Sequence, residues 1–357
     1  MMDWDGLMNG GDGRKRTVIA GAGTGKTTML RRIATEHRHD CNVLYLTYTN
    51  ASAYEFRAAI VNELGYVPAN ITIMTWFSFL LTHGVRPFPA RGFTHRIDRM
   101  LFNEGRVRNR RGISRGSEQY YCPIPGLVYR SRLSDLAALC DEQWDGEVTN
   151  RVCSIYDAIL VDEGQDFAGY DYDVLGALME KAAEMVIVGD PRQQTYRTGN
   201  EPKHSGVPHI FEFLQTAKGY TPDTATLGTT FRCSKAVIDL ANSLYPKLPQ
   251  VTSSAERASN PLGSVSKIKK SDFETWTKSH NREFTVLRYD ARTKVPTECH
   301  MMNIGDSKGL TLEDVVIFPT PEMKKWLDGK PVNLKDGTRA KLYVAITRAR
   351  GDLFFVV

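Results

Sequence analysis

Val18-Ile19-Ala20-Gly21-Ala22-Gly23-Thr24-Gly25-Lys26-Thr27-Thr28 is the stretch that decides the fold of this 357-residue chain. The short apolar run at its start predicts a buried strand, and the run from Met29 to Thr35 that follows predicts a helix. Glycines in such a loop let successive backbone N–H groups turn toward phosphate oxygens, while the helix N-terminus adds partial positive charge. The stretch therefore predicts a phosphate-binding loop of the Walker A kind, with Ala20 in place of the first glycine.

The loop and a second motif predict the chemistry of the site. We expect Lys26 to bridge the β- and γ-phosphates of a nucleotide, and Thr27 to ligate Mg²⁺. Far downstream, Ile159-Leu160-Val161-Asp162-Glu163 has the form of a Walker B strand that ends in two acids. Asp162 is expected to hold Mg²⁺ together with Thr27, and Glu163 to polarise the attacking water as a general base. The residues expected to contact the nucleotide are Ala22, Gly23, Thr24, Gly25, Lys26, Thr27 and Thr28.

Short apolar runs alternate with helical stretches along the whole chain. This alternation is typical of α/β domains in which parallel sheets are flanked by helices. The ligand of such a sheet is expected beyond the carboxyl ends of the strands. The expected strands are Val18–Ala20, Val43–Thr47, Ile71–Met74, Ile159–Val161 and Met185–Val188, followed by a second set at Phe284–Leu287, Val315–Phe318 and Leu353–Val357.

The length of the chain predicts two domains, one of which carries an insertion. We expect the first domain at residues 1–83 and 151–222, the insertion at 84–150, and the second domain at 223–357. Between Gly84 and Gly116 the sequence has nine arginines and two acidic residues, whereas the whole chain has a net charge of only +5. A basic segment of this kind suits a nucleic-acid backbone, and a solvated surface loop is the alternative.

Composition points to an ordinary globular protein. The chain is 41% hydrophobic and 24% charged, it has no apolar run long enough to cross a membrane, and its N-terminus does not resemble a signal peptide. We therefore expect a protein of the cytoplasm that is not secreted and has no membrane partner. The six cysteines are scattered, so that neither a zinc site nor a disulfide framework is expected.

Further motifs follow in a fixed order. Asp162-Glu163-Gly164-Gln165-Asp166 resembles the D-E-x-Q-D box of UvrD/Rep-like superfamily 1 DNA helicases. The other segments that resemble helicase motifs of that family are Leu46–Ala53 (Ia), Thr75–Phe79 (Ib), Val188–Tyr196 (III), Thr229–Ser234 (IV), Ser307–Leu310 (V) and Leu342–Arg350 (VI). The resemblance covers the chain apart from the insertion and a segment from about Leu248 to Trp276.

The resemblance implies a motor built from two RecA-like P-loop domains. By resemblance Gln193 senses the γ-phosphate, while Arg232 and Arg348 act as arginine fingers. Phe231 is expected to stack on the base, and Gly309 to contact the nucleotide. The implied partner is single-stranded DNA, together with tailed duplex DNA and replication or repair proteins. Residues in boxes expected to contact nucleic acid are Tyr48, Thr49, Asn50, Trp76, Phe77, Ser78 and Tyr196, although Trp76 and Phe77 equally suit a core role.

The function that the resemblance implies is an ATP-driven motor that translocates on single-stranded DNA and unwinds duplex DNA, with 3′→5′ polarity as in the UvrD/Rep-like helicases. The sequence departs from the resemblance in ways that loosen nucleotide selection. No glutamine precedes Lys26, and Thr311 stands where many relatives have an acid. Two alternatives remain open, namely a nucleotide-gated binding or loading module without unwinding, and a motor that moves on RNA.

Overall fold

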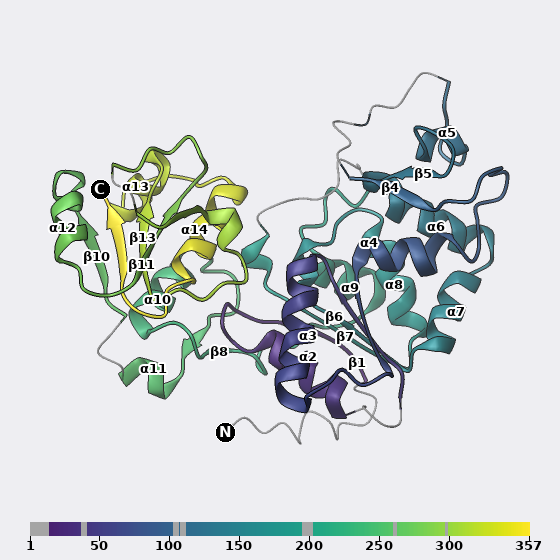
Figure 1. The fold of residues 1–357 in the computed structure, drawn as a ribbon, viewed down its shortest axis with the longest axis horizontal. Coiled ribbons are helices and arrows are strands. Elements are labelled where there is room, and N and C mark those ends of the chain that lie inside the picture. Colours follow the sequence, from purple (N-terminus) through teal and green to yellow (C-terminus); the bar gives the residue numbers. More distant parts are fainter. Residues whose placement is uncertain are drawn as a thin grey trace. The chain divides into compact units, whose positions relative to one another are not determined.

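The chain folds into two compact units. The computed structural model describes residues 14–36, 41–102, 107, 112–194, 203–259, 263–296 and 299–357 (Figure 1). The first unit comprises the described residues within Met1–Val18, Thr27–Gly189 and Arg197–Asp223, and the second those within Ile19–Lys26, Asp190–Tyr196 and Thr224–Val357. The phosphate-loop residues up to Lys26 therefore group with the second unit, whereas Thr27 groups with the first.

A parallel sheet forms the centre of the first unit. In the described residues its five strands have the order β1-β7-β6-β2-β3. β2, β3, β6 and β7 are paired in parallel, and every residue of β2 and of β6 is buried. Continuous burial is what a sheet covered on both faces requires, which explains the uninterrupted apolar runs. The strands are β1 (Lys15–Ile19), β2 (Val43–Thr47), β3 (Ile71–Thr75), β6 (Ala158–Val161) and β7 (Glu184–Gly189).

Helices surround this sheet, and further helices and a strand pair lie between β3 and β6 in the chain. α2 and α3 lie side by side (Figure 1), joined by an ion pair between Arg31 and Glu63. The helical elements of the unit are α2 (Lys26–Glu36), α3 (Asn50–Leu64), α4 (Trp76–Phe79), η1 (Leu80–Val85), α5 (Glu118–Tyr121), η2 (Arg130–Arg132), α6 (Leu133–Gln143), α7 (Glu147–Ile155), η3 (Gly164–Asp166), α8 (Asp171–Lys181) and α9 (Ile210–Lys218). The parallel strand pair between β3 and β6 consists of β4 (Arg99–Leu101) and β5 (Leu127–Tyr129).

The second unit contains another parallel sheet. Among its described residues five strands have the order β10-β14-β13-β11-β12. Alternate residues of β13 face opposite sides, as the pleat of a strand requires. Val315 and Ile317 belong to a core shared with α10 and α14, whereas Val316 and Phe318 pack with Phe273 of α12. The strands are β8 (Thr229–Thr230), β9 (Thr252–Ser253), β10 (Val265–Ile268), β11 (Phe284–Arg288), β12 (Met301–Asn303), β13 (Asp314–Phe318) and β14 (Leu353–Val356).

The helical elements of the second unit cover both faces of this sheet. Since apolar residues line both of those faces, neither could be left open to water. The elements are η4 (Pro191–Gln193), α10 (Lys235–Ser243), α11 (Ala255–Ser259), η5 (Lys270–Asp272), α12 (Phe273–Ser279), η6 (Ile304–Ser307), α13 (Pro321–Leu327) and α14 (Asp336–Ile346).

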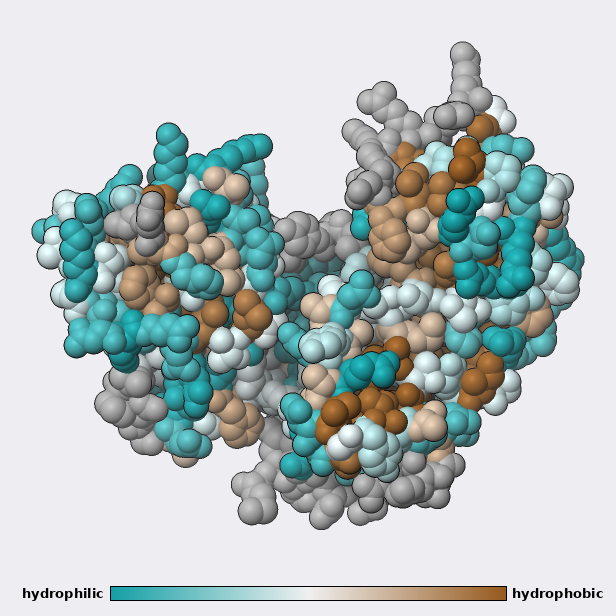
Figure 2. Space-filling model, viewed as in Figure 1, coloured by the Kyte–Doolittle hydropathy of each residue, from teal (hydrophilic) through white to brown (hydrophobic). Residues whose placement is uncertain are grey.

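Hydrophilic residues cover most of the face drawn in Figure 2, with apolar residues gathered in small groups. Large apolar side chains that are exposed among the described residues include Tyr54, Tyr66 and Phe231. No helix in the described part of the chain has the length and apolar character that a membrane span needs.

The predicted fold class is confirmed, since the chain forms parallel sheets flanked by helices in the manner of two RecA-like domains. Val43–Thr47 was predicted to the residue. The first strand was placed too late, because it begins at Lys15, where polar residues at the sheet edge hide it from a search for apolar runs. β10 and β12 were not predicted, because each is short and includes polar residues. The domain limits expected from the sequence stay a prediction.

Candidate nucleotide site and nucleic-acid surface

The glycine-rich loop has the backbone geometry of a phosphate-binding loop. Gly23 and Gly25 have φ values of 70° and 93°, in the left-handed region that favours glycine. The Thr24 hydroxyl donates to the carbonyl of Gly21 at 3.0 Å, and the Lys26 amine donates to the same carbonyl at 2.8 Å. The amine therefore lies against the loop itself, where a positive charge is placed to meet phosphate oxygens.

Thr27 and Asp162 lie together although 135 residues separate them in the sequence. The Thr27 hydroxyl donates to Oδ2 of Asp162 at 2.8 Å. Thr27 lies in the first turn of α2, and Asp162 follows the end of β6, where only 2% of its surface is exposed. A threonine hydroxyl and a carboxylate at the carboxyl edge of a parallel sheet are oxygen donors of the kind that Mg²⁺ prefers.

Glu163 follows directly and has an unusual backbone conformation. Its φ of 56° is in the left-handed region, which is uncommon for a residue other than glycine. Its N–H donates to Oδ1 of Asp162 at 2.8 Å, and its carboxylate accepts a hydrogen bond from the Gln165 amide. Such strain is found at functional sites, where the surrounding structure holds it in place. Here the conformation turns the chain so that adjacent acids have different partners.

A network of buried polar groups follows β7. Asp190 and Arg192 form an ion pair at 3.0 Å, with 0% and 1% of their side chains exposed. The Gln193 amide nitrogen donates to Asp190 Oδ2 at 2.9 Å, so the orientation of the glutamine is fixed. The Gln193 oxygen lies 3.5 Å from an Arg348 nitrogen, which is a long contact. The structure thus brings together the predicted γ-phosphate sensor, Gln193, and one of the predicted arginine fingers, Arg348.

The two predicted arginine fingers have different environments within the second unit. Arg348 is 1% exposed and donates to the carbonyls of Val344 and Leu310 at 3.1 Å each. Arg232 is half-buried and donates to the carbonyl of Thr347 at 3.2 Å. A Cβ at Gly23 would lie 2.6 Å from Cβ of Arg232, so this arginine starts beside the loop. The backbone of Arg232 therefore lies beside the phosphate loop, whereas the guanidinium of Arg348 is held by carbonyls of the second unit.

The remaining residues predicted to contact the nucleotide lie at the surface or in the loop. Phe231 is 54% exposed, and its N–H donates to the carbonyl of Gly23 at 2.9 Å. The N–H of Ala22 points to the Tyr343 hydroxyl at 3.5 Å. Thr28 is exposed in α2, and Gly309 has a left-handed φ of 88° just after η6. An exposed aromatic ring beside the loop is suited to stack on a base.

Two of the predicted nucleic-acid residues form an aromatic pair. The rings of Tyr48 and Phe77 meet edge to face with centroids 5.2 Å apart, and both side chains are half-buried. The guanidinium carbon of Arg130, from the insertion, lies 5.8 Å from the centre of the Phe77 ring. Partly exposed aromatic faces next to a cation are the usual surface for single-stranded nucleic acid.

The assignment of Trp76 to the nucleic-acid surface is wrong. Trp76 is fully buried, and its indole N–H donates to Oδ1 of Asp171 at 2.7 Å. Its ring packs on Phe79 and Phe167. A base has no access to a ring in this position, so Trp76 has the core role that the sequence left as its alternative.

The small polar residues predicted at this surface have local structural partners. Thr49 caps α3 by accepting from the N–H of Ser52 at 3.1 Å, and Asn50 is the exposed first residue of that helix. The Ser78 hydroxyl accepts from Thr75 at 2.9 Å. All three lie at the helix starts next to Tyr48 and Phe77 along the chain. Tyr196 lies outside the described residues.

Some arginines of the predicted basic insertion have partners in the structure, and others lie outside the described residues. Arg115 forms an ion pair with Asp135 at 2.7 Å, and burial raises the pKa of this aspartate despite the arginine. Arg86 donates to the carbonyls of Ile97 and Asp98. These two arginines therefore have partners within the first unit, which the charge pattern did not predict. The densest part of the basic run, Arg106, Arg108, Arg110 and Arg111, lies outside the described residues.

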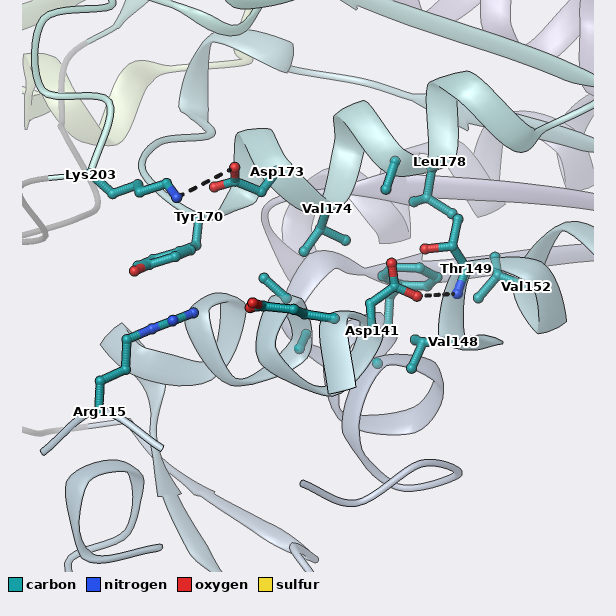
Figure 3. Close-up of a pocket in the computed structure, with 16 residues that line it drawn as sticks. Arg115, Asp141, Val148, Thr149, Val152, Tyr170, Asp173, Val174, Leu178 and Lys203 are labelled. Carbon is teal, nitrogen blue, oxygen red and sulfur yellow. Dashed lines mark hydrogen bonds and ion pairs between the residues drawn. The ribbon is translucent and has the colours of Figure 1, made fainter. Parts of the chain in front are cut away.

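A cavity of about 250 Å³ lies between α6, α7 and α8 of the first unit. Its floor is apolar, with Val148, Val152 and Leu178, whereas Arg115 and Lys203 lie near Tyr170 at the other end (Figure 3). None of the site residues predicted from the sequence lines this cavity.

The fold and the site define the class of protein. Parallel sheets with a glycine-rich loop after β1 and two acids after β6 are the features of a P-loop NTPase. Two family models match the chain, the AAA domain over residues 12–199 and the viral superfamily 1 RNA helicase core domain over residues 142–357. The chain therefore belongs to the superfamily 1 helicases and to the family of viral superfamily 1 RNA helicase core domains.

Solved structures with a similar fold include a viral helicase. The crystal structure of arterivirus nonstructural protein 10 (helicase) has a TM-score of 0.46 and 16% identity, covering 96% of this chain and 59% of its own. Its complex with DNA has a TM-score of 0.45 and 16% identity, covering 96% of this chain and 61% of its own. This chain thus spans about three fifths of the length of these structures. No curated protein sequence matches the chain.

Membership of this family implies that the site takes a nucleotide and usually Mg²⁺. The residues present fit both, because Lys26 supplies positive charge while Thr27 and Asp162 supply oxygen ligands. In the described residues no cluster of three or more His, Cys, Asp or Glu side chains is arranged to hold a metal. A P-loop site does not need such a cluster, because phosphate oxygens and water complete the coordination of Mg²⁺.

Sequence reasoning missed several residues that shape the site. Tyr45, Arg192 and Tyr343 are buried polar side chains that contact Asp162, Asp190 and the phosphate loop respectively. Tyr45 was predicted only as part of the strand Val43–Thr47, and no role was assigned to Arg192 or Tyr343. Arg192 and Tyr343 lie within recognised motifs, so a search of those motifs for buried polar groups would have found them. Tyr45 had no such signal.

Proposed function

We propose that this chain is an ATP-driven motor that moves along single-stranded nucleic acid. The observation that carries the proposal is the contact between Thr27 and Asp162, with Lys26 and Glu163 as their sequence neighbours. This constellation supplies the oxygen ligands, the phosphate-binding cation and the base that phosphoryl transfer to water requires.

Each group has a defined task in the proposed reaction. Lys26 binds the phosphates, Thr27 and Asp162 hold Mg²⁺, and Glu163 accepts the proton of the attacking water. Bound there, Mg²⁺ neutralises charge on the phosphate oxygens. Gln193 reports the presence of the γ-phosphate, and Arg232 and Arg348 meet the charge that develops on it. Gln193 and Arg348 are already neighbours, which supports their acting together.

The single strand of nucleic acid is proposed to lie over Tyr48 and Phe77. Their half-buried rings offer faces on which bases of any sequence can stack, which a moving protein needs. Arg130 beside Phe77 extends this surface onto the insertion and adds a charge for the backbone. Thr49, Asn50 and Ser78, which lie at the adjacent helix starts, are proposed to contact phosphate or ribose.

Two substrates have support of different kinds. The ordered motifs resemble UvrD/Rep-like DNA helicases, which favours single-stranded DNA, unwinding of tailed duplexes and 3′→5′ polarity. The matching family is described as a viral superfamily 1 RNA helicase core, which favours RNA as the second candidate. Stacked bases and backbone contacts serve either polymer, because neither reads the 2′-hydroxyl.

Phosphate release with and without single strands tests the enzymatic proposal. We expect release of phosphate from ATP to rise on adding oligo-dT or oligo-U, and Lys26→Ala to abolish the stimulated rate. The matched control is Lys235→Ala, which removes an exposed lysine paired with Asp239 and leaves the rate unchanged. Equal rates for wild type and Lys26→Ala, or no stimulation by either strand, would favour a nucleotide-gated binding module instead. The oligonucleotide that stimulates phosphate release more strongly, oligo-dT or oligo-U, identifies the polymer on which the motor acts.

Strand displacement tests the movement itself. We expect a duplex with a 3′ single-stranded tail to be separated in an ATP-dependent reaction, and a duplex with a 5′ tail to remain paired. Phe77→Ala should weaken binding of the single strand about tenfold or more, since stacking contributes about 1–3 kcal/mol per base. Tyr66→Ala removes an exposed aromatic residue elsewhere on the first unit and serves as the control. Displacement of the 5′-tailed duplex alone would reverse the proposed polarity.

A further inference from the structure

Tyr45 places a hydroxyl group inside the core of the first unit. The residue lies in the middle of β2 and is 0% exposed. Its ring stacks on Phe56 of α3 with centroids 3.5 Å apart and an angle of 11° between the planes. Its hydroxyl donates to Oδ2 of Asp162 at 3.0 Å. A phenylalanine would pack on Phe56 equally well, so the packing of the ring does not explain the hydroxyl.

The strand register explains how the hydroxyl meets this carboxylate. Tyr45 is paired with Leu160 in the parallel ladder between β2 and β6. Asp162 lies two residues beyond Leu160, on the same face of the sheet, because side chains alternate along a strand. The N–H of Asp162 donates to the carbonyl of Leu46 at 2.9 Å, which continues the ladder past the end of β6. The contact is therefore built by the sheet and does not depend on a loop.

Donors from three elements meet at the carboxylate of Asp162. Oδ2 accepts from Tyr45 of β2 at 3.0 Å and from Thr27 of α2 at 2.8 Å. Oδ1 accepts from the N–H of Glu163 at 2.8 Å. Together these three hydrogen bonds orient the carboxylate from within the first unit.

We propose that Tyr45 is a positioning residue for the metal-binding carboxylate, and that its hydroxyl sets the affinity of Asp162 for Mg²⁺. The inference rests on the proposed function, in which Thr27 and Asp162 hold the ion. If the Thr27 hydroxyl became a ligand of the ion, the Tyr45 hydroxyl would still donate to Oδ2 of Asp162 from a fully buried ring. Hydrogen bonds that orient a ligand from behind commonly change metal affinity or activity by about 10- to 100-fold when removed.

Titration of Mn²⁺, as a paramagnetic substitute for Mg²⁺, tests the inference without requiring turnover. Binding is followed by electron paramagnetic resonance on the full chain, in the presence of a non-hydrolysable ATP analogue. We expect Tyr45→Phe to remain folded and to weaken Mn²⁺ binding about tenfold. The matched control is Tyr220→Phe, which removes a half-buried hydroxyl that donates to the Met179 carbonyl at 3.3 Å and should bind Mn²⁺ like wild type.

A second variant separates the hydroxyl from the ring. Phe56→Leu removes the stacking partner and keeps the Tyr45 hydroxyl, so it should lower the melting temperature and leave Mn²⁺ affinity unchanged. An equal loss of affinity in Phe56→Leu would attribute the effect to packing and overturn the inference. Should Tyr45→Phe fail to fold, 3-fluorotyrosine at position 45 changes the strength of the hydroxyl donor alone, and an unaltered Mn²⁺ affinity would overturn the inference equally.

The outcomes distinguish this inference from the function on which it rests. If wild type binds no Mn²⁺ together with the nucleotide analogue, the proposed function fails whatever Tyr45 does. If wild type binds the ion and Tyr45→Phe has the same titration curve, Tyr45 has only a packing role and the proposed motor is unaffected. A tenfold loss confined to Tyr45→Phe supports both.

Discussion

Asp162 and Asp314 are buried carboxylates in the two sheets, but they lie at opposite ends of their strands. Asp162 follows the carboxyl end of β6, where Thr27 and Tyr45 donate hydroxyl groups to it. Asp314 is the first residue of β13 and pairs with His280 at 2.7 Å and with Arg282 at 2.8 Å. Both are almost completely buried, with 2% and 1% of their surfaces exposed.

The two carboxylates differ in the kind of partner that compensates for burial of the charge. A buried charge must be paired or hydrogen-bonded, and Asp314 meets this need with fixed side chains of its own unit. The hydroxyl donors of Asp162 orient the carboxylate and can be shared with an incoming cation. In a parallel sheet the ligand sits at the carboxyl ends of the strands, and the amino ends are left to structural pairs. We therefore propose that Asp162 has a functional role and Asp314 a stabilising one.

The largest expected effect comes from neutralising the acid at the carboxyl end. Asp162→Asn keeps the size of the side chain but removes the charge proposed to hold Mg²⁺. We expect strand-stimulated ATP hydrolysis to fall about 10²–10³-fold, as for the loss of a preorganised electrostatic group. Steady-state phosphate release measures this change, and urea unfolding checks that the variant is folded. Hydrolysis within a few-fold of wild type would contradict the proposed role of Asp162, because this acid would then have no more chemical role than Asp314.

The acid at the amino end should affect stability instead. Asp314→Ala leaves Arg282 and the N–H of Asp352 without this acceptor. Breaking a buried pair costs about 3–5 kcal/mol, which we reduce to about 2–3 kcal/mol because 36% of the Arg282 side chain reaches solvent. Urea unfolding measures the loss, with Asp328→Ala, at an exposed pair with Lys267, as a control that changes stability far less. A matching fall in nucleotide affinity of the folded variant would contradict the assigned role.

The smallest expected effect concerns the buried histidine His83. Burial, followed by the charge of Arg151, lowers the pKa of His83 below its usual value of 6.5. Between the lowered pKa and about 6.5 the unfolded chain binds more protons than the folded one, so stability increases as pH rises through this window. This contribution of His83 to stability is fully present above pH about 6.5 and is lost as the pH falls through the lowered pKa. His83→Gln should flatten the unfolding free energy over this range, measured by urea midpoints at several pH values. An unchanged slope would show that His83 titrates alike in both states.

The fold was predictable wherever one local signal was sufficient. The apolar run Val43–Thr47 can be stable only inside a covered parallel sheet, and the glycines at positions 23 and 25 announce the left-handed turns of the phosphate loop. The acids that follow the run Ile159–Val161 were recognised because polar residues directly after such a run mark the ligand edge of the sheet. The identity of these elements depends on interactions between near neighbours in the chain.

The sequence could not separate two adjacent aromatic residues. Trp76 and Phe77 are equally apolar, yet Trp76 is fully buried against Asp171, whereas Phe77 is half-buried beside Arg130. Asp171 is 95 residues from Trp76, and Arg130 is 53 from Phe77. Which ring turns inward depends on those partners, which no local pattern contains.

By itself, therefore, the sequence determined the parallel α/β architecture, the phosphate loop and the order of the helicase motifs, because strand propensity, burial period and turn chemistry are local properties. Only the tertiary structure decided that Tyr45 lies behind Asp162, that Trp76 is buried, and that Arg115 holds Asp135. Such contacts join residues far apart in the chain, and they follow from strand register and close packing, which the whole fold must fix together.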